Sequence, residues 1–93
     1  MVSITKIEDM CNEICNHLYL KHALFIEISK PKHKRNTIAF NIFSYKSNLI
    51  GTINNIFKQE YGKDVTIING YVVYFTYDEL LEFYTILKIK GDI

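Results

Sequence analysis

The chain of 93 residues has no long apolar run, and it is poor in cysteine, proline and glycine. No apolar stretch approaches the ~20 residues that a helix needs to span a bilayer, so we expect no contact with a membrane. The first residues carry acids where a signal peptide would need a basic start and an apolar run. Two cysteines are too few for a disulfide framework. Together these absences predict a cytoplasmic protein in a reducing compartment.

The two cysteines, Cys11 and Cys15, are four residues apart in a segment with helical periodicity. A zinc site would need four ligands, and His17 and His22 are the only nearby candidates. His17 follows Cys15 by two residues, which turns it away from the cysteine face of a helix. We therefore interpret Cys11 as a small buried apolar residue and predict no metal and no other cofactor.

The residues that are present predict one packed domain. Apolar residues make up 48% of the chain and aromatic residues 14%, which is enough for a core. Helical spacing of apolar residues predicts helices over about residues 3–19 and 46–61. A third helix is predicted to begin at a capping box over residues 76–79. Strands are predicted in 23–29, in 36–43 and on either side of Asn69-Gly70, a dipeptide typical of type I′ hairpin turns.

The predicted fold class is α+β, with the seven elements in the order αββαββα. The chain is expected to form a single compact domain spanning residues 1–93. Its two hairpins would form one four-stranded antiparallel sheet with the helices packed on one face. The other face of this sheet is predicted to be open.

The first predicted helix carries an apolar seam that resembles a short heptad pattern. Such a seam suits either a partner helix or the sheet of the same chain, and the spacing leaves both alternatives open. Because a small domain gains core by pairing, a homodimer is expected. The candidate dimer interface is Ile4, Ile7, Cys11, Ile14 and Leu18.

The net charge of +1 hides a strong segregation of charge. Residues 28–59 contain six basic residues and no acid. Most of them fall in SKPKHKRN, residues 29–36, which is predicted to be the tip of the first hairpin because Pro31 is barred from a central ladder position. A basic tip can follow a phosphate backbone, although lysines at hairpin tips also keep sheets soluble. The predicted nucleic-acid-binding residues are Lys30, Lys32, His33, Lys34, Arg35, Thr37, Asn41 and Lys46.

Three segments, ALFIEISK, FNIFSYKSNLIGTINNIFKQEYGKDV and YVVYFTYDELLEFYTIL, carry a resemblance to a known family. Over about residues 10–90 the chain resembles the LAGLIDADG homing-endonuclease domain, whose core has the same αββαββα order. The resemblance implies that the open sheet face and the hairpin tips lie along a DNA groove, so the implied partner is DNA rather than RNA. It would place Ser29, Thr37 and Asn41 near bases or sugars.

The chain departs from this family at the end of the first helix. The acidic, metal-binding position of the family's signature falls on Leu20, and a leucine cannot bind magnesium. His17 and Lys21 stand where the resemblance implies small residues that let two helices pack closely. The sequence also has no Gly-rich phosphate loop and no evident Ser or Cys nucleophile motif. We therefore expect a degenerate domain without catalytic residues.

Two functions of different classes remain open. One is a non-catalytic nucleic-acid-binding module that uses the basic tip and the open sheet face. The other is a small viral or mobile-element protein that binds and inhibits a host protein, for instance as an anti-CRISPR. It would use its last helix and the tyrosines of its second hairpin, because aromatic residues are favoured anchors in interfaces. The net charge of +1 is low for a nucleic-acid binder.

Overall fold

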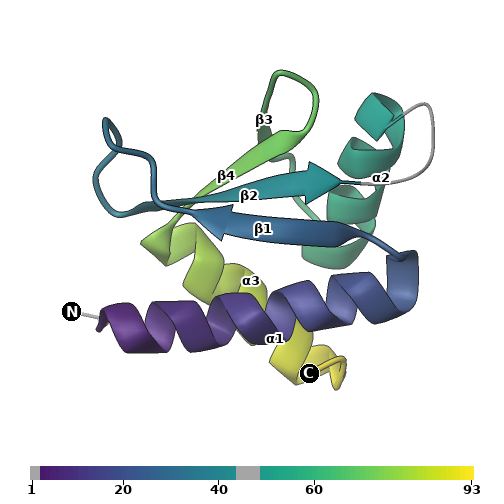
Figure 1. Ribbon diagram of the computed structural model, residues 1–93. Helices are drawn as coiled ribbons and strands as arrows, with labels where there is room; N and C mark the ends of the chain where they lie inside the picture. Colours follow the sequence, from purple (N-terminus) through teal and green to yellow (C-terminus); the bar gives the residue numbers. More distant parts are fainter. Residues whose placement is uncertain (1–2, 44–48) are drawn as a thin grey trace.

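Three helices and four strands follow one another in the predicted order in the computed structural model, which describes residues 3–43 and 49–93 (Figure 1). None of the helices in these ranges is long and apolar enough to cross a membrane. The predicted α+β fold is confirmed. The elements are α1 (Ile4–His22), β1 (Phe25–Ser29), β2 (Thr37–Phe43), α2 (Leu49–Tyr61), β3 (Thr66–Ile68), β4 (Val72–Thr76) and α3 (Tyr77–Lys90).

The two hairpins join into one antiparallel sheet with the strand order β1-β2-β4-β3. The central pair, β2 and β4, brings Thr37 opposite Thr76 and Asn41 opposite Val72. In the second hairpin Asn69 has φ 55° and Gly70 has φ 82°, the two positive values that a type I′ turn requires. The predicted hairpin signal is therefore confirmed.

Local capping explains where two of the helices begin. The Ser3 side chain accepts a hydrogen bond from the backbone N–H of Lys6 at the start of α1. At the start of α3, Thr76 and Glu79 form the predicted capping box, in which each side chain accepts from the backbone N–H of the other residue. These side chains satisfy N–H groups that have no partner within the helix.

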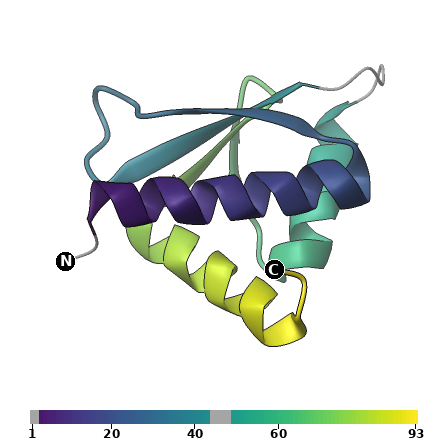
Figure 2. The same cartoon turned by 60° about the horizontal axis from the view of Figure 1, so that its bottom comes forward.

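Helices α1 and α3 lie side by side across one face of the sheet, and α2 closes the same core at one end (Figures 1 and 2). Because side chains alternate along a strand, every second residue of β2 and β4 points toward these helices. Those residues are almost completely buried: Ile38, Phe40, Ile42, Val73 and Phe75. The opposite face is covered by no helix among the described residues.

The apolar seam of α1 packs against the sheet of its own chain, so the predicted dimer interface is wrong. Ile7, Ile14 and Leu18 are fully buried, and Cys11 is 1% exposed. Only Ile4, at 47%, is accessible. A helix that covers a sheet and a helix that pairs with a partner show the same apolar spacing, so the pattern could not distinguish them. Burial raises the pKa of Cys11 to about 12, and its predicted role as a buried apolar residue is confirmed.

Four aromatic rings hold α2 against β4 and α3. The Phe75 and Phe83 rings are stacked, with centroids 5.6 Å apart, and Phe57 and Tyr61 of α2 pack within 6.0 Å of both. The Tyr61 hydroxyl donates a hydrogen bond to Glu82 at 3.2 Å, so burial of this ring leaves no unsatisfied hydroxyl. This cluster fixes the last turn of α2, and thereby the neighbouring residue Glu60.

The residue that ends α1 is in a strained conformation. Ala23 has φ 57°, a left-handed value that is unfavourable for a residue with a Cβ and easy for glycine. We predict that Ala23→Gly raises the free energy of unfolding by about 0.5 to 1 kcal/mol, measured as a higher midpoint in urea with an unchanged m-value. The matched control is Glu8→Gly at an exposed position inside α1, where glycine should lower stability by a similar amount. A lower midpoint for Ala23→Gly would contradict the strain at this position.

Candidate functional site

The basic loop, defined as Lys30 to Arg35, joins β1 to β2 at one end of the sheet (Figure 1). Lys32, His33, Lys34 and Arg35 are all exposed. Within residues 3–43 and 49–93, no ion pair includes a cation of this loop, whereas five lysines elsewhere are paired with acids. The loop is therefore a concentration of positive charge that the described part of the chain does not neutralise.

Contacts with the end of β4 and the start of α3 hold this loop in place. The Lys34 ammonium lies 5.3 Å from the ring centroid of Tyr74, and the Lys30 ammonium lies 6.0 Å from that of Tyr77, both at cation–π distances. The backbone N–H of Tyr77 donates to the carbonyl of Asn36 at 2.8 Å. The base of the loop is thus anchored, while its charged groups face solvent.

Three of the residues predicted to bind nucleic acid follow the basic loop in the sequence, and they differ in where they lie. The prediction is wrong for Thr37, which is 6% exposed and donates its hydroxyl to the Arg35 carbonyl at 2.9 Å. Asn41 lies on the face opposite the helices, and its side-chain amide donates to Ser29 Oγ and to the Glu27 carbonyl at 3.0 Å each. Lys46 lies outside the described residues.

The open face of the sheet, defined as the face opposite the helices, presents aromatic side chains at both ends of the first hairpin. Phe25 and Phe43 are paired in register at the far end of the first hairpin, where both are exposed. The ring of Phe25 also packs on Tyr19, with centroids 4.9 Å apart. Tyr74 is half-buried beneath Lys34. This face therefore combines flat aromatic surface with adjacent positive charge.

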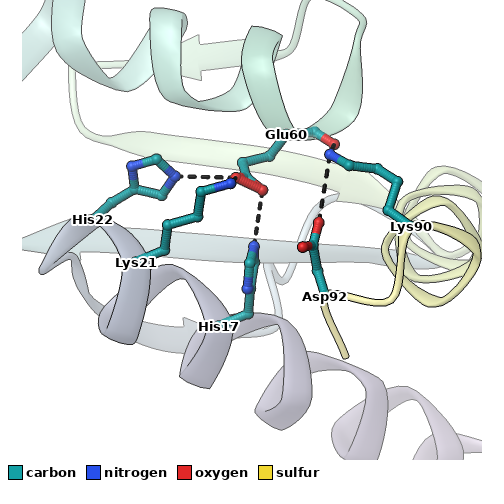
Figure 3. Close-up of polar contacts among 6 residues, drawn as sticks. All are labelled: His17, Lys21, His22, Glu60, Lys90 and Asp92. Carbon is teal, nitrogen blue, oxygen red and sulfur yellow. Dashed lines mark hydrogen bonds and ion pairs between the residues drawn. The ribbon is translucent and has the colours of Figure 1, made fainter.

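A buried carboxylate, Glu60, lies in the last turn of α2 and faces the C-terminal turns of α1 (Figure 3). Its side chain is 0% exposed and contacts three donors from the last turns of α1. His17 Nε2 lies 2.8 Å from Oε1, whereas Lys21 Nζ and His22 Nε2 each lie 3.1 Å from Oε2. Glu60 therefore ties the C-terminal end of α1 to the last turn of α2.

These donors decide the charge of Glu60. Burial by itself raises the pKa of a carboxyl group, but hydrogen bonds from His17, His22 and Lys21 outweigh burial and lower the pKa of Glu60 to about 2. The carboxylate is thus ionised at neutral pH and can only accept hydrogen bonds. It follows that His17 and His22 each carry a proton on Nε2 when they contact it.

Asp92, just after α3, completes a group of three ligand-type side chains. One suitable atom each from His17, Glu60 and Asp92 lies within 4.8 Å of the others. Asp92 Oδ2 is buried and accepts no hydrogen bond from the described residues. The nearest cation is Lys90, whose Nζ is 3.5 Å from that oxygen and 3.5 Å from the Glu60 carbonyl (Figure 3). Asp92 therefore has fewer hydrogen-bond donors around its carboxylate than a partly buried acid needs.

Sequence reasoning missed Glu60 because its partners are about forty residues away in the chain. The cysteines nearest to His17 lie on another face of the helix, so they give no sign of its partner. The sequence does contain a pattern that points to burial of Glu60. This residue follows Ile53 by seven residues and Ile56 by four, so it continues the apolar stripe of α2. An acid in such a stripe predicts a buried charge that needs partners.

We predict that Glu60 makes the stability of the protein depend on acid. Its pKa is lower in the folded chain than the ordinary 4.5, so its contribution is complete above about pH 4.5 and is lost as the pH falls toward about 2. The difference corresponds to about 3 kcal/mol. Glu60→Gln should be less stable at neutral pH by a similar amount and should lose less stability over that acid range.

Urea unfolding at several pH values, in buffer with a chelator, tests this prediction. The matched control is Asp64→Asn, since Asp64 is also acidic but its side chain is 82% exposed, and its loss should change little. If Glu60→Gln showed the same pH dependence as the unaltered protein, the pKa of Glu60 would not be the cause.

Comparisons with known proteins found no relative of the chain. No protein-family model, curated protein or solved structure gave a match to the chain. The resemblance to the LAGLIDADG domain therefore stays a prediction.

Proposed function

We propose that the chain is a non-catalytic nucleic-acid-binding module, with DNA rather than RNA as its partner. The basic loop would contact the phosphate backbone, and the open face of the sheet would contact the bases. The observation that carries this proposal is the set of four loop cations that have no acidic partner among the described residues, placed at the edge of a sheet face that no described helix covers.

Electrostatics support the basic loop as the phosphate contact. The loop residues line a shallow hollow of about 370 Å³, so their charges surround a common space. Cations that are already paired with an acid must break that pair before they bind a phosphate, whereas no loop cation has an acidic partner among the described residues. Each phosphate that they neutralise releases counterions, which favours binding at low salt.

The composition of the open face supports contact with bases. Exposed aromatic rings provide flat surfaces on which bases can stack, and Phe43 is 51% exposed on this face. The Asn41 amide, on the same face, can donate to or accept from base edges, although it would first have to leave Ser29 and Glu27. The proposed surface therefore offers both stacking and hydrogen bonding.

The absence of catalysis is proposed from the resemblance together with the position of Leu20. The resemblance would put this residue at the place that the family uses for its metal-binding acid, and Leu20 is 73% exposed on α1. A hydrocarbon side chain supplies no oxygen ligand for magnesium. The proposed activity is therefore binding alone.

A second candidate, a protein-binding module that inhibits a host factor, is supported by exposed apolar residues outside the open face. Ile89 is 81% exposed and Leu81 is 37% exposed, both on α3, and Tyr71 is exposed in the second hairpin. Aromatic and aliphatic anchors of this kind are typical of protein interfaces. A homodimer, if formed, would use these residues and not the buried seam of α1.

Replacement of three loop cations tests the nucleic-acid proposal. We predict that the unaltered chain binds a fluorescently labelled DNA at low salt, measured by anisotropy, and that Lys32→Ala, Lys34→Ala and Arg35→Ala together reduce affinity at least tenfold. The slope of log K against log salt should fall by roughly 2 to 3 units, because each lost phosphate contact removes about 0.7 to 0.9. Duplex DNA, single-stranded DNA and RNA should be compared.

The matched control removes the same charge elsewhere. Lys58, Lys63 and Lys88 are exposed lysines that are each paired with an acid, so their combined change to Ala should reduce affinity much less. An equal loss in both triple variants would mean that only net charge matters. The absence of any binding at high micromolar protein would reject the proposal and favour the protein-binding module.

A further inference from the structure

We infer that His17, Glu60 and Asp92 form a binding site for a divalent transition-metal ion, best matched by Zn²⁺. This inference is independent of the proposed nucleic-acid binding. The three side chains come from α1, α2 and the segment after α3, which are far apart in the sequence. Their ligand atoms lie within 4.8 Å of one another, the only such group among the described residues.

The distances are close to those of a metal-bound state. In a tetrahedral zinc site, bonds of about 2.0 to 2.2 Å place neighbouring ligand atoms roughly 3.3 Å apart. His17 Nε2 and Glu60 Oε1 are already 2.8 Å apart, so these two atoms need only separate slightly. Asp92 lies after Gly91, beyond the last turn of α3, and a small movement of its side chain brings its oxygen to the ion. A water molecule would take the fourth position.

The buried oxygen of Asp92 is a second, separate observation that points to a cation. Asp92 Oδ2 is buried without a hydrogen-bond donor, an arrangement that is unfavourable for a carboxylate. Lys90 compensates only weakly, because its Nζ is 3.5 Å away and its side chain is 41% exposed. A divalent ion would satisfy this oxygen directly and displace the Lys90 ammonium toward solvent.

The groups around the site fit a metal as well. Lys21 and His22 bind Glu60 Oε2 and so orient the carboxylate with Oε1 toward the ion, as outer partners of metal ligands commonly do. Two carboxylates and one neutral imidazole balance the charge of a divalent ion. Nε2 of His17 must carry no proton when it binds the ion, so the proton of the neutral ring would be on Nδ1. An imidazole with carboxylates suits zinc, whereas magnesium prefers oxygen ligands alone.

Zinc titration of the metal-free full chain tests the inference by two readouts. At a free Zn²⁺ concentration a hundred times Kd, the melting temperature should rise by on the order of 10 °C, and EDTA should reverse the shift. Co²⁺ should give the intense visible absorption of a tetrahedral site with a stoichiometry of one ion per chain. Mg²⁺ at the same concentration should produce neither effect.

Three variants make the test specific to these residues. Asp92→Asn, which keeps the shape of a partly exposed side chain, should lower Zn²⁺ affinity at least tenfold, and His17→Gln should do the same. Lys90→Ala should raise the affinity several-fold, because it removes the competing ammonium. A merely structural ion network predicts no metal response in any of them. No zinc-dependent shift in the unaltered chain, or an undiminished shift in Asp92→Asn, would overturn the inference.

Discussion

The ion contacts of Glu60 are the constraint on which the arrangement of the helices depends. A carboxylate without solvent contact is tolerated only when donors replace its water, and here the donors are His17, Lys21 and His22 of α1. Three residues at the end of one helix must therefore face the last turn of another. Since Tyr61 is packed into the aromatic cluster beside it, α2 cannot rotate to relieve this requirement. The end of α1 and the end of α2 are fixed together.

The three helices lie on one side of the sheet, and no described helix covers the other side. The apolar seam of α1 is used within the chain, as are the aromatic residues of α2 and α3. The open face retains exposed aromatic residues, and the four cations of the basic loop lie at its edge. Elsewhere in the described residues five lysines pair with acids, whereas the cations of the basic loop have no acidic partner there.

Local signals account for what the sequence could predict. The Asn69-Gly70 turn, the Thr76 capping box and the apolar spacing of α1 each depend on residues within a few positions of one another, and each predicted its element correctly. Interactions between distant residues were not accessible in this way. The contact of His17 with Glu60 spans 43 positions, and Thr37 is buried at 6% exposure, with its hydroxyl donating to the Arg35 carbonyl. Whether a side chain on the open face is exposed depends on how the neighbouring loop folds. The alternation of apolar and polar residues along a strand does not specify this.

The two positions at which the resemblance implies small residues show why the departure of α1 matters. Small residues there would let a second helix approach closely, whereas His17 and Lys21 carry long polar side chains that reach Glu60. A helix that uses this face to hold a buried carboxylate cannot also use it for a close crossing with a second copy. Because the donors contact α2 of the same chain, α1 is committed to the fold of the monomer. A partner that docked on this side of α1 would first have to displace the contacts of His17 and Lys21 with Glu60.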